Sequence, residues 1–187
     1  MNNISNVIIS IILLFIFSPL MFIIYLILKI SSPKEKSIFV TERFGQNNKL
    51  FKMYKFRTMK TGSPQVDTNN LKDSSIYVTN IGKFLRIFSL DELPQLICVL
   101  KRDMNLIGPR PALFTQKDLI SMRTNLKIHT LKPGITGYAQ INGRDKISLN
   151  HKIELEKYYM NNKSILLDIK ILLATIFYIF KIGSIKH

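Results

Sequence analysis

The sequence contains no tryptophan, one cysteine and three histidines among its 187 residues. The single cysteine, Cys98, cannot form an internal disulfide, and its aliphatic neighbours predict a small buried side chain. The histidines are far apart and have no cysteine or carboxylate at zinc-finger or H-E-x-x-H spacing, so neither kind of zinc site is indicated. Any metal is therefore expected to be a hard ion held by carboxylates.

Acidic residues are also scarce, with 12 Asp and Glu against 27 Lys and Arg, a formal net charge of +15. Such an excess predicts a polyanionic partner: nucleic acid, an anionic membrane or a phosphate-bearing substrate. A recognition helix is not evident, although residues 54–57 interleave aromatic and cationic side chains. We therefore expect no nucleic-acid partner.

No charged side chain precedes Lys29. The mostly apolar run from Val7 to Leu28 would be roughly 33 Å long as a helix, enough to reach across a bilayer. Residues 1–6 offer neither the positive stretch nor the cleavage site of a secretory signal peptide. Ser18-Pro19 predicts a break or kink, because proline removes a helical hydrogen bond that the Ser18 hydroxyl can replace. This pattern leaves a re-entrant helix and a kinked crossing helix equally open.

Residues 29–60 carry nine Lys or Arg against Glu35 and Glu42. At about 1 kcal/mol per cation near an anionic leaflet, this cluster could hold the chain against anionic membrane lipids. Basic residues after the apolar run also place that end in the cytoplasm. The sequence thus predicts a membrane segment over residues 1–30 and a cytoplasmic domain over residues 31–187.

The remaining pattern predicts an α+β, mostly helical fold. Residues 38–44 and 50–59 indicate a β-hairpin around the turn 45–48, and residues 61–75 an exposed loop. Helices are expected near 93–102, 112–127 and 148–160, with a turn-rich stretch over 133–144. Residues 165–182 are apolar but carry Asp168, Lys170 and Lys181, which favours an interfacial amphipathic helix over a second crossing.

Two adjacent carboxylates, Asp91 and Glu92, are the first candidates for chemistry. With Ser89 they have the form of a capping box, in which Glu92 would only cap a helix. Pro94 conflicts with that interpretation, because proline prefers the first helical position. A helix beginning at Pro94 would instead place both carboxylates just before its N-terminus, where their ionised forms are favoured. Ionised carboxylates can bind Mg²⁺ or act as a nucleophile.

A second candidate is Gly108-Pro109-Arg110-Pro111, in which two prolines limit the movement of an arginine and suit it to clamp a phosphate. Pro133-Gly134 and Asn142-Gly143 are turn dipeptides, and Arg144 follows the second. Taken singly, each of these segments also fits a plain solvated turn.

Taken together, these segments resemble the small monotopic bacterial phosphoglycosyl transferases, polyprenyl-phosphate enzymes of the bacterial sugar transferase family. The resemblance covers nearly the whole chain. It rests on several segments in this order: Ser18-Pro19 in an apolar run, residues 54–59 (YKFRTM), residues 90–96 (LDELPQL), Asp103-Met104, residues 108–111 (GPRP), residues 132–137 (KPGITG) and residues 142–144 (NGR).

The resemblance implies that Asp91 attacks the phosphate next to the sugar of a UDP-sugar, releasing UMP, and that polyprenyl phosphate then takes the phosphosugar from the aspartyl intermediate. It implies that Glu92 supports Mg²⁺ and positions Asp91, both carboxylates being metal ligands. Substrate binding is implied for Lys55, Arg86, Arg110, Pro111 and Arg144. Ser18-Pro19 would mark a re-entrant helix at the cytoplasmic face of the inner membrane, and the reaction would begin glycoconjugate assembly. Neither the sugar nor the oligomeric state is implied.

The chain departs from the family at four places. Residues 1–6 lack the basic stretch and the aspartate that often precede the membrane helix. Tyr138 stands where tryptophan is common, Arg102 where glycine is common, and Glu156 where aspartate is usual. A non-catalytic polybasic membrane adaptor is the alternative hypothesis, because it explains the charge and the apolar segment without the carboxylates.

Overall fold

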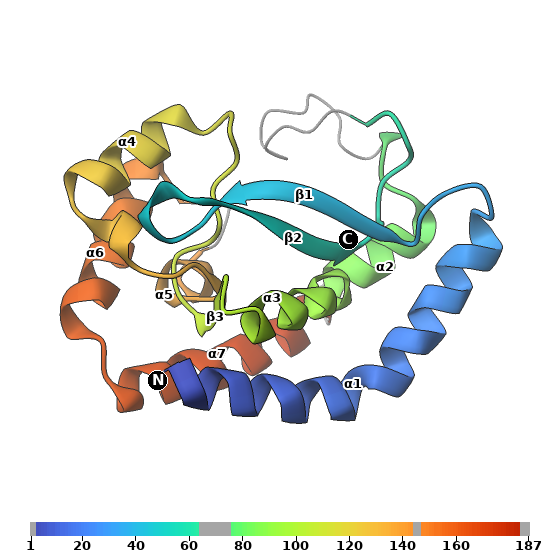
Figure 1. Cartoon of the computed structure of the whole chain (residues 1–187), viewed down its shortest axis with the longest axis horizontal. Helices are drawn as coiled ribbons and strands as arrows, with labels where there is room; N and C mark the ends of the chain where they lie inside the picture. The colour runs from blue at the N-terminus through green and yellow to red at the C-terminus, as the bar shows by residue number, and fades with distance from the viewer. Residues whose placement is uncertain (1–2, 64–75, 144–146, 184–187) are drawn as a thin grey trace.

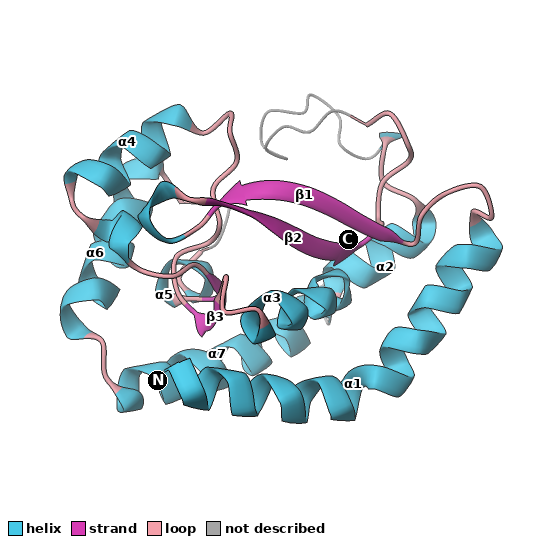
Figure 2. Cartoon of the chain, viewed as in Figure 1, coloured by secondary structure: helices cyan, strands magenta, loops and turns pink. Residues whose placement is uncertain are grey.

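The computed structural model describes residues 3–63, 76–143 and 147–183. These form a mostly helical fold with a small antiparallel hairpin, as expected, and Figure 2 shows the hairpin among the helices. In chain order the elements are α1 (Asn3–Ser31), β1 (Ile38–Phe44), the 3₁₀ helix η1 (Gln46–Asn48), β2 (Leu50–Phe56), α2 (Asn80–Ile87), the 3₁₀ helix η4 (Leu90–Gln95), α3 (Leu96–Leu100), β3 (Asn105–Ile107), α4 (Lys117–Asn125), the 3₁₀ helix η5 (Ile128–Thr130), β4 (Gly134–Thr136), α5 (Tyr138–Ile141), α6 (Leu149–Asn162) and α7 (Ile165–Gly183).

The predicted hairpin is confirmed, with β1 and β2 antiparallel and Phe44 opposite Leu50. β2 ends at Phe56, three residues before the predicted end at Met59. The turn contains left-handed residues at Asn47 and Asn48 (φ 55° and 57°), a conformation that asparagine tolerates better than most residues. The predicted loop 61–75 falls mostly outside the described residues.

Several short elements differ from the sequence expectations. α2 was not predicted, because eight residues give a weak periodic signal; Thr79 caps it by accepting a hydrogen bond from the Gly82 N–H at 3.0 Å. β3 and β4 pair in parallel, with Asn105 opposite Gly134, so no local turn in the sequence indicates the pairing. Two helices are shorter than predicted: α3 begins only at Leu96, after η4, and α4 only at Lys117. The helix predicted near 148–160 is confirmed as α6.

α1 continues from Asn3 to Ser31 with Pro19 inside it, and Figure 1 shows the predicted bend between its two arms. Pro19 has no N–H to donate to the Phe15 carbonyl four residues earlier. The Ser18 hydroxyl donates to that carbonyl at 2.9 Å instead. The bend is therefore hydrogen-bonded from within the helix, as the Ser-Pro pair predicted.

Both arms of α1 pack on the same body of the protein. Ile9 and Leu13 of the first arm lie against the largest core cluster, which includes Val99 and Met104. On the second arm, Ile24 and Leu28 form a separate cluster with Phe56 and Leu85. The hairpin covers one side of η4 and α3, and α1 covers the other (Figure 1).

The outer faces of α1 and α7 are apolar and exposed. Among the described residues, α1 alone is long and apolar enough to cross a membrane, and only 11% of its most apolar window is buried. Phe15 is 82% exposed on α1, and Phe177 is 73% exposed on α7. Apolar surface of this extent is typical of a membrane or protein contact. The long N-terminal helix can thus associate with a membrane.

Asp168 does not interrupt the apolar face of α7, because it points into the protein. It is buried, and the Tyr159 hydroxyl of α6 donates a hydrogen bond to its Oδ1 at 2.8 Å. Burial, followed by this hydrogen bond, raises the pKa of Tyr159, which keeps the hydroxyl a donor. The outer face of α7 is therefore apolar apart from the exposed Lys170, a pattern that suits an interfacial helix.

Arg102 occupies a left-handed position with φ 64°, which accounts for the glycine common there in the family. A side chain in this conformation costs about 1 kcal/mol or more, and Arg102 is exposed, so its removal loses little contact. We expect Arg102→Gly to stabilise the fold by about 1 kcal/mol in denaturant unfolding. Arg102→Ala keeps the strained backbone and is the control; equal stabilisation by alanine would contradict the explanation.

Candidate active site

The 3₁₀ helix η4 carries both candidate carboxylates. With three residues per turn, Leu90 and Leu93 share one face, and both pack against the cluster formed by the second arm of α1. Asp91 and Glu92 therefore leave the helix on its other two faces. The capping box is not formed, because Ser89 is left-handed (φ 53°) and its side chain makes no capping bond. The alternative helix start at Pro94 is also wrong, since Pro94 lies inside η4.

Glu92 receives two cations on one oxygen. Its Oε1 lies 2.8 Å from the Lys55 Nζ and 3.0 Å from the Arg110 Nη2. Lys55 comes from β2, whereas Arg110 follows β3, so three distant segments meet here. Asp91 and Glu92 are only 7% and 6% exposed, which strengthens these ion pairs relative to surface pairs.

Burial and the nearby cations act in opposite directions on the pKa of Asp91. Burial, and then the neighbouring Glu92 carboxylate, raise the pKa of Asp91, while Lys55, Arg86 and Arg110 pull it back. The pKa of Lys55 is lowered, mainly by burial, and Glu92 opposes that shift. The site therefore keeps a carboxyl group with a raised pKa among three cations. Each added positive charge would favour its ionised form.

Arg86 reaches the site from α2, which the sequence did not predict. Its Nε donates a hydrogen bond to the Thr58 hydroxyl at 2.9 Å, just beyond the end of β2. This contact orients the guanidinium near the Asp91 charge, on which it acts electrostatically. Thr58 was not identified as a site residue, although it lies within the sequence pattern over residues 54–59.

Three glycines explain how the Arg110 loop is held. Gly108 and Gly134 touch through their backbones: a Cβ on Gly134 would lie 2.0 Å from the Gly108 nitrogen. A Cβ on Gly137 would lie 2.1 Å from the Gly108 oxygen. The Gly134 N–H also donates to the Pro109 carbonyl at 2.9 Å. The two glycine-containing patterns, residues 108–111 and 132–137, thus pack directly together and place Arg110, with the buried Pro111, beside the carboxylates.

Arg123 and Glu156 form a buried ion pair behind this loop. The Arg123 Nε donates to Glu156 Oε2 at 2.8 Å and its Nη2 to Oε1, a two-point contact between α4 and α6. The Arg123 Nη1 donates to the Arg110 carbonyl at 3.0 Å. Glu156, noted as a departure from the family, therefore helps to position the Arg110 backbone. Arg123 lies in no sequence motif, so the sequence alone did not identify it.

Arg123→Met is expected to lower the free energy of unfolding by about 3–5 kcal/mol, because it leaves a buried Glu156 without its cation. Denaturant titration would measure this change. Glu154→Gln on the same α6 helix is the control, because the Glu154 side chain is 74% exposed and its contact with His151 lies at the surface. An effect no larger than that of the control would show that the buried pair does not support the fold.

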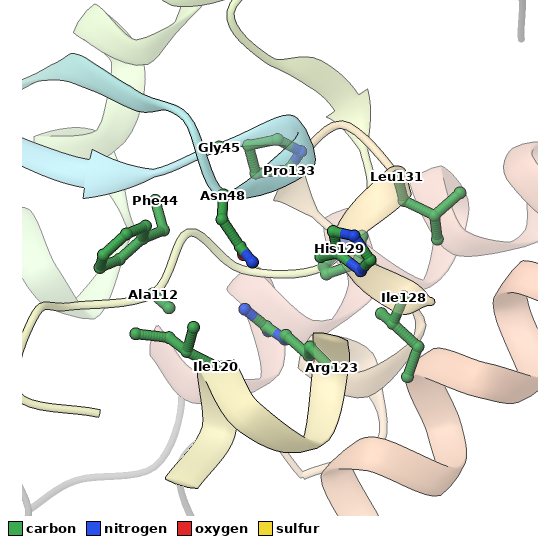
Figure 3. A pocket seen from close by; sticks show the side chains of 11 residues that line it. Phe44, Gly45, Asn48, Ala112, Ile120, Arg123, Ile128, His129, Leu131 and Pro133 are labelled. Carbon is green, nitrogen blue, oxygen red and sulfur yellow. The ribbon is translucent and has the colours of Figure 1, made fainter. Parts of the chain in front are cut away.

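A small cavity lies behind the Arg110 loop. Its volume is about 20 Å³, room for one water, and Asn48, Arg123 and His129 are among its lining residues (Figure 3). Neither Asp91 nor Glu92 lines it. The cavity therefore lies among the residues around the Arg110 loop, and it is not the space where a large substrate would meet the carboxylates.

The structure brings five of the predicted site residues together: Asp91, Glu92, Lys55, Arg86 and Arg110. Arg144 lies outside the described residues. Among the residues that are described, no three His, Cys, Asp or Glu side chains gather as a complete metal site. Two adjacent carboxylates do suit Mg²⁺, which commonly takes one or two carboxylates together with substrate phosphates and water. The raised pKa of Asp91 marks a place where an added cation would be favourable.

The known proteins that resemble this chain include a sugar transferase and two sugar-phosphate transferases. The chain is 44% identical over 149 residues to the uncharacterized sugar transferase EpsL of Bacillus subtilis, covering 80% of this chain and 71% of that protein. It is 39% identical to the UDP-N-acetylgalactosamine-undecaprenyl-phosphate N-acetylgalactosaminephosphotransferase of Aeromonas hydrophila, covering 86% of this chain and 39% of that protein. It is 36% identical to the UDP-glucose:undecaprenyl-phosphate glucose-1-phosphate transferase of Klebsiella pneumoniae, covering 94% of this chain and 39% of that protein.

The chain thus spans about two fifths of the length of the latter two relatives. The model of the bacterial sugar transferase family matches residues 1–182, which include every described element of the candidate site. The chain therefore belongs to the bacterial sugar transferase family.

Proposed function

We propose that the protein is a phosphoglycosyl transferase that moves a phosphosugar from a UDP-sugar to polyprenyl phosphate, the first membrane step of glycoconjugate assembly. The observation that carries this proposal is the buried Asp91-Glu92 pair, with Lys55 and Arg110 on Glu92 and the charge of Arg86 acting on Asp91. The activities for which the Aeromonas and Klebsiella relatives are named support the same substrate classes.

In the proposed first step, an Asp91 carboxylate oxygen attacks the phosphorus next to the sugar. A P–O bond forms to Asp91, the P–O bond to UMP breaks, and UMP leaves with the bonding electrons. In the second step, an oxygen of polyprenyl phosphate attacks the same phosphorus and releases the Asp91 carboxylate. A carboxylate nucleophile divides one difficult transfer into two easier ones.

In this scheme, the three cations near Asp91 would reduce charge repulsion. A diphosphate approaching Asp91 brings negative charge toward a carboxylate, and Lys55, Arg86 and Arg110 would offset that repulsion. The same three cations favour ionised Asp91 against its burial. Glu92 holds Lys55 and Arg110 beside the reacting carboxylate. Arg144 is proposed as a further substrate contact by resemblance alone.

We propose Asp91 and Glu92 as the residues that would hold Mg²⁺. When bound, the ion would supply positive charge to the diphosphate and its leaving group. Because the ion would also favour ionised Asp91, removing Mg²⁺ with a chelator is expected to reduce UMP release.

We propose that α1 is a re-entrant membrane segment, with residues 31–187 as a catalytic domain on the cytoplasmic face of the inner membrane. In support, both arms of α1 contact the same body of the protein, whereas one arm of a kinked crossing helix would leave that body to reach the opposite leaflet. The basic stretch after α1 and the apolar face of α7 would add contacts with anionic lipids and the interface. A lipid-linked acceptor phosphate would then lie at the depth of the headgroups.

The test is to incubate the detergent-solubilised protein with a panel of UDP-sugars, Mg²⁺ and polyprenyl phosphate, and to identify the nucleotide product. UMP is expected. Release of UDP would mean that the sugar alone had moved and would exclude the proposed reaction. Salt-sensitive liposome binding with no nucleotide release from any donor would favour the polybasic adaptor.

A further inference from the structure

Two polar side chains, Asn6 and Ser10, are buried in the largely apolar first arm of α1. Asn6 is 3% exposed and Ser10 is fully buried. They lie four residues apart, so they share one face of the helix. Buried polar groups are almost always hydrogen-bonded, and the identity of their partners shows what they hold.

Ser10 differs in its hydrogen-bond partner from Ser18 and Ser31 of the same helix. Ser18 and Ser31 donate to carbonyls within the helix, those of Phe15 and Ile27. The Ser10 hydroxyl donates instead to the Leu96 carbonyl at 2.9 Å, across 86 positions of sequence. Leu96 directly follows η4, the helix that carries Asp91 and Glu92.

Asn6 makes the equivalent contact with β3. Its Oδ1 accepts a hydrogen bond from the Leu106 N–H at 2.9 Å. β4 pairs with the other side of β3, so the Leu106 N–H lies on the open edge of this two-stranded sheet. Asn6 thereby satisfies a buried backbone donor that no strand in the described part of the chain reaches. β3 leads directly into the loop that carries Arg110.

We propose that Asn6 and Ser10 are positioning residues that clamp the two halves of the active site, η4 and the Arg110 loop, to one face of the membrane arm. The inference rests on the proposed function, because it assigns these residues a part in that reaction. A single rigid helix bonded to both segments fixes their separation. The arm must therefore be docked for Asp91 and Arg110 to hold their relative positions.

The proposal can be tested in full-length protein in nanodiscs with the variants Asn6→Leu and Ser10→Ala. Each is expected to lower kcat for UMP release, per folded molecule, by about tenfold, equivalent to about 1.4 kcal/mol in the barrier, with KM for the donor nearly unchanged. Asn6→Asp keeps the acceptor oxygen but adds a charge at a buried site, so it should recover part of the kcat that Asn6→Leu loses. Ser31→Ala, which removes a bond within α1, is the matched control and should have no effect.

Hydrogen exchange gives a readout that is independent of activity. The Leu106 amide should exchange about tenfold faster in Asn6→Leu, and return toward the parent rate in Asn6→Asp. Unchanged exchange in Asn6→Leu, or an unchanged kcat per folded molecule in both Asn6→Leu and Ser10→Ala, would overturn the clamp. If the parent protein released no UMP from any donor, the proposed function would fail, while the exchange experiment would still decide whether the contact exists.

Discussion

Asp91→Asn is expected to abolish formation of the proposed covalent phosphosugar adduct and to lower UMP release by roughly 10⁴-fold or more, as loss of a nucleophile does in enzymes that form covalent intermediates. Asparagine keeps the size and shape of the buried side chain but cannot present an ionised oxygen to phosphorus. The measurement is labelling of the protein by a donor with a labelled sugar-proximal phosphate, without acceptor, followed by mass spectrometry of the labelled peptide.

Asp118→Asn is the matched control, because Asp118 is an exposed carboxylate on α4, remote in sequence from η4. It should label like the parent protein. Removing Asp91 also removes one of two adjacent negative charges, so the fold should remain intact or gain stability, and a thermal scan would verify this. An adduct mapped to another residue, or normal labelling of Asp91→Asn, would reassign the nucleophile.

The fold could be predicted where a pattern was local. The hairpin had two strand-forming segments on either side of a turn-forming segment. The bend in α1 had a proline next to a serine whose hydroxyl could donate a hydrogen bond to the freed carbonyl. β3 and β4 could not be found in this way, because each has three residues and its partner lies almost thirty positions away. The left-handed Ser89 likewise depends on packing around η4, so both local interpretations of the segment around Pro94 were wrong.

In the candidate site, too, residues within a local sequence pattern were predicted and residues with distant partners were not. Asp91, Glu92, Lys55 and Arg110 were identified because motifs contain them, and Arg86 because its position matches a basic residue of the family. The structure brings their segments together. The residues that hold those motifs in place, among them Arg123 and Ser10, were missed. Their partners are separated by 33 and 86 positions, and a lone arginine or serine has no pattern of its own. Supporting contacts of this kind become visible only in three dimensions.

Lys55→Met is expected to lower UMP release on the order of a hundredfold, the usual loss when one charge-stabilising donor is removed from an active site. Methionine fills much of the same buried space but cannot pair with Glu92, which then keeps only Arg110 of the two cations that contact its Oε1. Lys52→Met, on the exposed face of the same β2 strand, removes an equal formal charge and is the control. Equal losses from the two variants would mean that net charge, not the contact with Glu92, sets the rate.

Lys55→Met is also expected to change the pH dependence of UMP release, in a way that a general loss of folding would not produce. The proposed reaction needs ionised Asp91, so UMP release should fall as the pH drops through the pKa of Asp91, which burial holds above its ordinary value of 3.8. Lys55 opposes that upward shift. Without Lys55, the pKa of Asp91 rises further, and the acidic limb of the profile must move to higher pH. A limb that stayed in place, or moved to lower pH, would show that the Lys55 charge does not act on Asp91.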